Sequence, residues 1–332
     1  MLKDSTLEKK ITNQIPIIDI GKLQSNETQD HEEIADNFIK AYSTVGFSYI
    51  VNHNIDQRII DDIFIASKEF HSLPRKEKQK IELNHLHRGF IPINSSTEPN
   101  SDLANTIIPN QSESFIMMRD AQKDDLEVIN NTYLAGPNIW PENVIHFKER
   151  TIRYAEAMTE LCAKLTSIIT KGIGITRSEY ISLFEVPTIW LRLLYYPSQS
   201  QSSYDNTFGS APHRDFGGIT ILSQDQIGGL QVKTRSGDWL DAPEIPGTFV
   251  VNVGNMLHRL SNGFLMSTPH RVINKSNKER YSCPFFFDPN VNATIKPLGN
   301  HVNKKNPAKF NPMIYGDYLK NELSTTYNQH KD

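Results

Sequence analysis

The chain has 332 residues, of which 38% are hydrophobic, so it holds enough apolar material for a substantial core in one large domain or two. Lysine and arginine total 35 against 38 aspartates and glutamates, and the basic residues form no long stripe, which argues against nucleic acid or a membrane surface as a partner. No apolar run reaches the about 18 residues of a membrane span, and residues 1–20 lack the apolar core of a secretory signal. Only Cys162 and Cys283 are present, too few for a disulfide framework, so we expect a reducing, cytoplasmic compartment.

The first part of the chain is predicted to be mostly helical, with a few short strands. Residues 15–20 (IPIIDI) and 46–53 (GFSYIVNH) are rich in β-branched and aromatic residues and predict strands. Between them, residues 31–45 carry apolar side chains at helical spacing, and residues 56–73 continue the same period. These patterns predict a strand, a helix, a second strand and a second helix in that order.

A loop-rich segment and one long helix follow. Residues 88–143 are rich in Asn, Ser, Pro and Gly and predict loops, with one short strand at 112–118 (SESFIMM). Residues 144–173 predict a long helix whose apolar stripe is typical of core packing. The stripe consists of Ile152, Ala155, Met158, Cys162, Leu165 and Ile169.

After Gly174 the pattern changes to short extended runs separated by turns. Eight candidate strands without long helices between them indicate a sandwich or jelly roll, which encloses a binding cavity between two sheets. The runs are TIWLRLLYYP, ITILSQD, GGLQVKT, DWLDAP, GTFVVNVG, HRVINK, RYSCPFFFDP and NATIKPL. Residues 311–329 then predict a closing helix, with Pro312 near its start.

The stretch APHRDFGGITIL (211–222) contains the first candidate metal ligands. If it is extended, His213 and Asp215 project from the same face, because residues two apart in a strand do so. The two side chains are then placed either to share one metal ion or to hydrogen-bond each other. His-x-Asp alone is a weak signal, so a second histidine is needed.

Two further histidines lie in the β-rich region, His258 and His270. His270 opens a predicted strand, whereas His258 lies in a helical or turn segment, so strand placement favours His270 and leaves His258 in reserve. Two imidazoles and one carboxylate on one side of a metal, with the other positions open, are typical of non-haem Fe(II) sites that bind oxygen and a substrate.

The strand RYSCPFFFDP adds a candidate anion site. Arg280 and Ser282 alternate with Tyr281 and Cys283, so they face the same way within an otherwise apolar strand. A buried guanidinium is costly unless an anion meets it, and arginine binds a carboxylate through two parallel hydrogen bonds. The anion is either a bound carboxylate ligand, which we favour, or an Asp or Glu of the protein itself.

With these residues the chain resembles the Fe(II)- and 2-oxoglutarate-dependent dioxygenases of the isopenicillin N synthase type. The resemblance covers nearly the whole chain through an ordered set of motifs: IPIIDI, GFSYIVNHNI, GPNIWP, LRLLYYP, GGLQV, GTFVVNVGNMLHRLSNG, STPHRVIN and RYSCPFFFDP. It implies iron ligands at His213, Asp215 and His270. It also implies that Arg280 and Ser282 hold the distal carboxylate of 2-oxoglutarate and that Tyr196 contacts the same cosubstrate.

The resemblance also implies a fold and a reaction. The fold is α+β with a mostly β core, a double-stranded β-helix (jelly roll) on which N-terminal helices and a long supporting helix pack. We expect an N-terminal region (1–175), the double-stranded β-helix core (176–300) and a C-terminal helix (301–332) that closes the site, all in one integrated unit. The reaction consumes Fe(II)-activated O2 and converts 2-oxoglutarate to succinate and CO2. It oxidises a C–H bond of a small molecule by hydroxylation, desaturation or oxidative cyclisation.

The sequence departs from the family pattern at two positions, which leaves its substrate open. Arg214 stands where relatives more often have a small polar residue, and Leu194 stands where many plant members have Asn. We expect the substrate pocket to include Arg192, Arg214, Phe115, Phe264 and Leu265. If either arginine faces the cavity, a carboxylate-bearing substrate is favoured.

Three alternatives remain at this point. An oxidase like isopenicillin N synthase itself would use Arg280 and Ser282 to hold its substrate and would need no 2-oxoglutarate; retention of Tyr196 argues against it. A non-catalytic jelly-roll binding protein would have no need for three convergent ligands. Zinc hydrolysis is disfavoured because no general base is evident beside the ligands.

Overall fold

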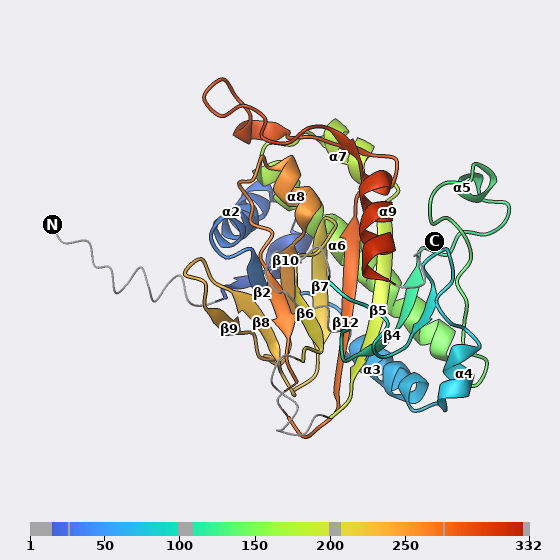
Figure 1. The fold of residues 1–332 in the computed structure, drawn as a ribbon. Coiled ribbons are helices and arrows are strands. Elements are labelled where there is room, and N and C mark those ends of the chain that lie inside the picture. The colour runs from blue at the N-terminus through green and yellow to red at the C-terminus, as the bar shows by residue number, and fades with distance from the viewer. Residues whose placement is uncertain (1–14, 26, 99–108, 199–206, 275, 328–332) are drawn as a thin grey trace.

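The structure is a computed structural model that describes residues 15–25, 27–98, 109–198, 207–274 and 276–327. Two sheets form its centre, and helices cover the outer face of the larger one (Figure 1). No helix of the described part of the chain combines the length and apolar character needed to cross a membrane.

The larger sheet has eight strands and is antiparallel except for one pair. Only β1 and β2 run parallel. In spatial order the strands are β1 (Ile17–Asp19), β2 (Phe47–Val51), β10 (Phe249–Val253), β7 (Ile219–Gln224), β12 (Arg280–Asp288), β5 (Thr188–Tyr196), β4 (Glu113–Met118) and β3 (Gly89–Ile91). The N-terminal part of the chain therefore supplies both edges of the sheet whose centre is built from the C-terminal half.

The smaller sheet has four strands and carries the stretch that begins at residue 211. Its order is β6 (Ser210–His213), β11 (His270–Val272), β8 (Leu230–Lys233) and β9 (Trp239–Asp241). A separate two-stranded ribbon joins β13 (Thr294–Ile295) and β14 (Met313–Ile314). All eight strands predicted after Gly174 are confirmed, whereas β3, β6 and β14 are additional.

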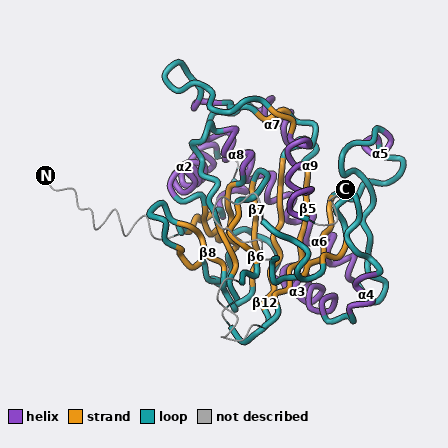
Figure 2. The backbone as a smooth tube through the Cα atoms, in the orientation of Figure 1, coloured by secondary structure: helices purple, strands orange, loops and turns teal. Residues whose placement is uncertain are grey.

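The predicted helices also form, and several short ones join them. The helices are α2 (Thr28–Thr44), α3 (Gln57–His71), α4 (Arg75–Gln79), α5 (Leu126–Ile129), α6 (Phe147–Gly172), α7 (Arg177–Phe184), α8 (Asn255–Leu260) and α9 (Tyr315–Thr326). Two 3-10 turns, η1 (Gly21–Gln24) and η3 (Gly299–His301), complete the set. The segment predicted as loops keeps long irregular stretches around α5, drawn in teal in Figure 2.

Strand alternation separates the core from the cavity. On β12, Cys283, Phe285 and Phe287 are buried in the core cluster that the helices α2, α3 and α6 share with the sheet. The intervening residues of β12 face the smaller sheet, where a second apolar cluster that includes Phe47 and Val272 joins the two sheets. The expected α+β jelly-roll architecture is thus confirmed, with a cavity between its two sheets.

Candidate active site

The cavity between the sheets receives side chains from both of them. All six residues implied as iron ligands or cosubstrate contacts line it, and so does Arg192. The large sheet contributes the arginines and Tyr196 from β5 and β12, and the small sheet contributes the histidines from β6 and β11. Segments far apart in the sequence therefore meet at one place.

Three potential ligands converge at one end of β6 and β11. His213 and His270 are direct cross-strand partners, and their rings lie 4.3 Å apart. Asp215 Oδ1 lies 3.7 Å from His213 Nε2 and 3.6 Å from His270 Nε2. Within the described residues, this is the one group of three His, Cys, Asp or Glu side chains whose ligand atoms converge within 4.8 Å.

Hydrogen bonds prepare each of the three side chains to bind a cation. His213 Nδ1 lies 2.7 Å from the Ala211 carbonyl oxygen, and His270 Nδ1 lies 3.2 Å from the Thr268 carbonyl oxygen. A carbonyl can only accept, so both Nδ1 atoms are protonated, which leaves each Nε2 atom on the side of Asp215 as the potential ligand atom. This is the tautomer that a metal-binding imidazole needs.

Asp215 is held through its other oxygen. Thr220 Oγ1 and Asn252 Nδ2 donate to Oδ2 at 2.5 Å and 2.7 Å, which leaves Oδ1 directed at the histidines. Burial works to raise the pKa of Asp215, but the two histidines and these two hydrogen bonds together hold the pKa below its usual value. Burial lowers the pKa of His270. The carboxylate is therefore ionised and the His270 imidazole neutral at pH 7, which is the state a divalent cation requires.

Asp288, at the end of β12, holds the turn that follows Asp215 in place. Asp288 Oδ1 accepts from the Gly218 N–H at 2.8 Å, and a Cβ at Gly217 would lie 1.6 Å from the same oxygen. Only glycine at 217 lets the carboxylate approach the turn this closely. Trp190 and Tyr315 donate to Asp288 Oδ2 at 2.9 Å and 2.8 Å. Residues from three elements thus fix the turn that follows Asp215.

Arg280 lies at the deep end of the cavity and is completely buried. Its Nε, Nη1 and Nη2 atoms donate to three neutral oxygens: Gly228 O at 2.5 Å, Ser282 Oγ at 3.1 Å and Gln224 Oε1 at 3.2 Å. Its guanidinium also lies 4.7 Å from the centre of the Tyr196 ring, because Arg280 and Tyr196 are cross-strand partners.

The charge of Arg280 is not neutralised by an ion pair. No ion pair within 4.0 Å joins it to a carboxylate of the described residues, although Asp225 lies within electrostatic range, since the charge of Arg280 acts to lower the pKa of that carboxyl group against the larger effect of burial. A guanidinium has more N–H donors than its three neutral partners use. A buried cation with free donors in a cavity is suited to bind a carboxylate group.

Arg192 lies on the same inner face, towards the other end of β5. Its Nε donates to Ser114 Oγ at 2.9 Å and its Nη1 to Tyr327 Oη at 3.3 Å. Four residues separate it from Tyr196, which corresponds to about 13 Å along an extended strand. The cavity thus has one arginine near each end, with the potential metal ligands on the facing sheet.

Three of the expected substrate contacts lie elsewhere. Phe115 is in the core on the opposite face of β4, where its ring packs against Phe70 and Phe147. Leu265 is wholly buried in the same core cluster. Phe264 is 37% exposed and stacks on His301 at 3.8 Å. These three residues therefore pack against protein side chains and do not line the cavity.

Arg214 and His258 lie beside the cavity lining. Arg214 is half-buried and is not among the residues that line the cavity. Burial lowers the pKa of His258, and the charge of Arg214 lowers it further. His258 Nδ1 bonds the Leu265 carbonyl at 2.6 Å, and this histidine is not part of the convergent group. A contact between Arg214 and a substrate stays a prediction.

Sequence reasoning missed several polar residues of the cavity. Thr220 and Asn252 line it from neighbouring strands, and Gln224 accepts a hydrogen bond from Arg280; their only sequence signal is a polar side chain within an apolar strand. Asn110 and Ser112 line the other end of the cavity, and Asn110 bonds Glu98. These residues come from irregular segments with no periodicity to mark them.

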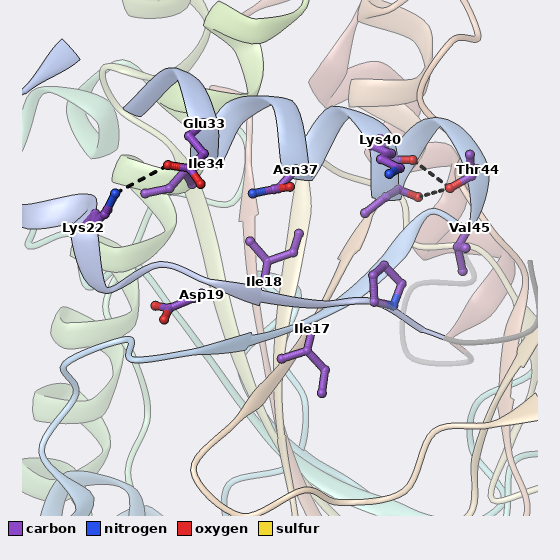
Figure 3. Close-up of a pocket in the computed structure, with 12 residues that line it drawn as sticks. Ile17, Ile18, Asp19, Lys22, Glu33, Ile34, Asn37, Lys40, Thr44 and Val45 are labelled. Carbon is purple, nitrogen blue, oxygen red and sulfur yellow. Dashed lines mark hydrogen bonds and ion pairs between the residues drawn. The ribbon is translucent and has the colours of Figure 1, made fainter. Parts of the chain in front are cut away.

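A second cavity lies between β1 and α2, away from the convergent ligands (Figure 3). Ile17, Ile18 and Asn37 are among the residues that line it, and Lys22 forms an ion pair with Glu33 at its edge. Its acidic residues are Asp19 and Glu33, and neither belongs to a convergent ligand group. The convergent ligand group of the described residues therefore lies in the cavity between the sheets.

Comparisons with known protein families cover both halves of the chain. The family described as the 2OG-Fe(II) oxygenase superfamily matches residues 188–289. The family described as the N-terminal region of non-haem dioxygenase in morphine synthesis matches residues 15–143. The first match spans β5 to β12 and includes all three convergent ligands.

Individual relatives match over nearly their full lengths. A homoarginine-6-hydroxylase of Glycine max is 30% identical, covering 94% of this chain and 97% of the relative. A 2-oxoglutarate-Fe(II) type oxidoreductase of Emericella nidulans is 31% identical, covering 94% and 90%. The crystal structure of a full-length Neurospora crassa protein in complex with alpha-KG (2-oxoglutarate) and thymine superposes with a TM-score of 0.80 at 28% identity, covering 94% and 97%.

Proposed function

Because the chain belongs to the 2OG-Fe(II) oxygenase superfamily, and is therefore an enzyme that uses Fe(II), 2-oxoglutarate and O2, we propose that its inter-sheet cavity holds all three. His213, Asp215 and His270 are the proposed iron ligands. Arg280, Ser282 and Tyr196 are the proposed contacts to 2-oxoglutarate. The observation that carries this assignment is the convergence of His213, Asp215 and His270 within 4.8 Å in the same cavity as Arg280.

The ligand set suits Fe(II) by its chemistry. Two neutral imidazole nitrogens and one carboxylate oxygen form the two-histidine, one-carboxylate triad of non-haem iron oxygenases, which leaves other coordination positions open. Both imidazoles keep their Nε2 lone pairs free, and Asp215 keeps Oδ1 free because Thr220 and Asn252 occupy Oδ2. With 2-oxoglutarate and O2, bound Fe(II) supplies the oxidation of a substrate C–H bond, and the cosubstrate leaves as succinate and CO2.

The protein side chains bind and orient the cosubstrate. Arg280 is the proposed partner of its distal carboxylate, since its guanidinium is buried, carries free donors and meets only neutral acceptors. The Tyr196 ring and the apolar side chains of Leu194 and Leu222 flank this end of the cavity and keep water from it. Exclusion of water strengthens the pairing between guanidinium and carboxylate.

The substrate is a small molecule, and we propose that it bears a carboxylate. Arg192 faces the cavity from β5 and forms no ion pair with a carboxylate of the described residues. The names of two relatives support a small polar substrate, since one is a homoarginine hydroxylase and another was crystallised with thymine. Hydroxylation, desaturation and oxidative cyclisation are all within the reach of this site.

An anaerobic titration of the Fe(II)-loaded protein with 2-oxoglutarate tests the assignment. Chelation of Fe(II) by the 2-oxo acid produces a visible charge-transfer band, which we expect to saturate with the unmodified protein. Asp215→Ala should abolish the band by losing iron, and Arg280→Ala should require far more 2-oxoglutarate. Absence of a band in the iron-loaded protein would overturn the roles of Arg280 and Ser282 and favour an oxidase that does not use 2-oxoglutarate.

A further inference from the structure

We propose that Glu98 and Arg192 form a pair of opposite charges at the substrate end of the cavity, and that the substrate bears both a cationic nitrogen and a carboxylate. This inference rests on the proposed function, because it concerns the occupant of the same site. Glu98 would bind the ammonium or guanidinium group, and Arg192 the carboxylate. The substrate class is that of amino acids and related zwitterions.

Glu98 is hydrogen-bonded to Asn110, a residue of the cavity lining. Asn110 lines the cavity, and its Nδ2 donates to Glu98 Oε1 at 3.3 Å and to Ser96 Oγ at 3.2 Å. Its Oδ1 accepts from the Ala211 N–H at 2.8 Å. Ala211 lies on β6 two residues before His213, so one amide side chain ties Glu98 to the strand that carries a proposed iron ligand.

The backbone around Glu98 is held from the other side by the end of α9. The Thr97 N–H donates to the Thr326 carbonyl at 3.0 Å, and Ser96 pairs with Tyr327 in an isolated bridge. Tyr327 also accepts from Arg192 at 3.3 Å. The same C-terminal residues therefore fix both the segment that presents Glu98 and the guanidinium of Arg192.

The electrostatic surroundings of Glu98 agree with this placement. Burial is the largest influence and raises the pKa of its carboxyl group above the usual value, although the nearby charges of His213 and Arg192 and the Asn110 hydrogen bond act to lower it. Asp215 is close enough to raise the pKa as well. Glu98 thus lies within electrostatic range of both the proposed iron ligands and Arg192.

Glu98 and Arg192 do not neutralise each other directly. No ion pair within 4.0 Å joins them, and each side chain hydrogen-bonds neutral groups: Glu98 bonds Asn110, and Arg192 bonds Ser114 and Tyr327. The two side chains carry opposite charges beside one cavity and interact electrostatically, but they form no ion pair. A ligand that bears both charges can therefore pair with each of them. A neutral ligand would leave both charges without an oppositely charged partner, which is costly in a desolvated site.

A matched set of probes separates the two charges. The Fe(II) and 2-oxoglutarate complex is titrated anaerobically with L-lysine and L-arginine, which carry both charges, with cadaverine and agmatine, which lack the carboxylate, and with hexanoate, which lacks the cation. Perturbation of the charge-transfer band gives the affinity of each probe, and succinate release in air gives turnover. We expect one or both amino acids to bind and to support succinate release, and the probes that carry charge of one sign only to bind far more weakly.

Variants assign each charge to its residue. Glu98→Gln keeps the shape and the Asn110 contact but removes the charge, and should weaken binding of the amino acid about 10- to 100-fold while leaving hexanoate binding unchanged. Glu98→Asp should recover part of the loss, and the exposed Glu156→Gln should change nothing. Arg192→Gln should weaken the amino acid and hexanoate but spare agmatine.

The outcomes separate this inference from the proposed function. If the band forms with 2-oxoglutarate but neither amino acid binds, or if Glu98→Gln binds the amino acid as tightly as the unmodified protein, the charge pair is wrong and the cofactor assignment stands. If no band forms at all, the proposed function itself fails.

Discussion

The two ends of the cavity are built in different ways. At the deep end, Arg280, Ser282 and Tyr196 come from two adjacent strands in the middle of the large sheet. At the other end, Arg192 is the strand residue, while Glu98 and Asn110 come from irregular segments and Tyr327 from the end of α9. The strand-built end is the one proposed to bind 2-oxoglutarate, and the loop-built end is the one proposed to select the substrate.

This difference follows from how the backbone is supported. A residue in a central strand has ladder hydrogen bonds to both neighbours, so its side chain keeps one direction. A loop can change in sequence and length without disturbing the sheet, so it can be adapted to a new ligand. The predictions below test whether the two ends act separately.

The largest effect is expected from removing the positive charge of Arg280. Arg280→Gln should weaken 2-oxoglutarate binding by about 30-fold to more than 1,000-fold, because truncating one partner of a buried charge pair costs about 2–5 kcal/mol. Arg192→Gln is the matched control at the other end of the same sheet face, and should leave 2-oxoglutarate affinity within about 2-fold. The charge-transfer titration measures both. Equal losses in the two variants would mean that the ends are not separate sites.

A second prediction concerns the support of the metal-site turn. Burial raises the pKa of Asp288 to about 6, above the ordinary aspartate value of 3.8. The folded state therefore binds a proton that the unfolded state releases between these values, so the contribution of Asp288 to stability is present below pH 4 and is lost as the pH rises through 6. The loss amounts to about 3 kcal/mol across that interval.

Asp288→Asn removes this titration. The free energy of unfolding of the unmodified protein minus that of the variant should fall by about 3 kcal/mol between pH 4 and 7, measured by urea unfolding at several pH values. The exposed Asp36→Asn is the control and should give a flat difference. A flat difference for Asp288→Asn would show that this carboxyl group does not titrate abnormally.

A third prediction tests how Asp215 is oriented. Asn252→Ala removes one of the two donors to Asp215 Oδ2, so the carboxylate can rotate its oxygens away from the histidines. We expect Fe(II) affinity to fall about 10- to 100-fold, the usual cost of losing a partner that orients a metal ligand. Asn143→Ala, which removes an exposed amide that bonds Glu77, should leave iron binding unchanged. If the iron affinity of Asn252→Ala were unchanged, the hydrogen bond from Thr220 alone would be enough to orient Asp215.

The contrast between the two ends also explains what the sequence predicted. Strand periodicity places His213 and Asp215 together, and likewise Arg280 and Ser282, because residues two apart share a face. The strand order and register that bring Thr220, Asn252 and Gln224 beside them are long-range properties that periodicity does not contain. Periodicity therefore pointed to four of the six proposed metal and cosubstrate residues, strand placement favoured His270, and only the family resemblance implied Tyr196, whereas the supporting partners were not predicted.

The substrate end was predicted less well for two physical reasons. Phe115 was expected in the pocket, but five of the six residues of β4 are buried, so alternation of apolar and polar residues could not say which face meets the cavity. Glu98 and Asn110 lie in segments rich in Pro, Ser and Asn, where no period marks the inward residues. The orientation of these residues follows only from hydrogen bonds to other elements. Asn110 bonds the backbone of β6, and the segment that carries Glu98 bonds the end of α9.

The smallest effect is expected from one hydroxyl at the substrate end. Tyr327→Phe removes the acceptor of the Arg192 Nη1 hydrogen bond while keeping the ring on which the guanidinium lies. Binding of L-lysine or L-arginine should weaken by about 2- to 10-fold, the value of one ordinary hydrogen bond, with 2-oxoglutarate affinity unchanged. Tyr318→Phe is a matched control, since it lies on the same helix and loses a hydroxyl that accepts from Asn255 instead. If Tyr318→Phe weakened the amino acid as much as Tyr327→Phe, the effect would come from a general loosening of α9 and not from the orientation of Arg192.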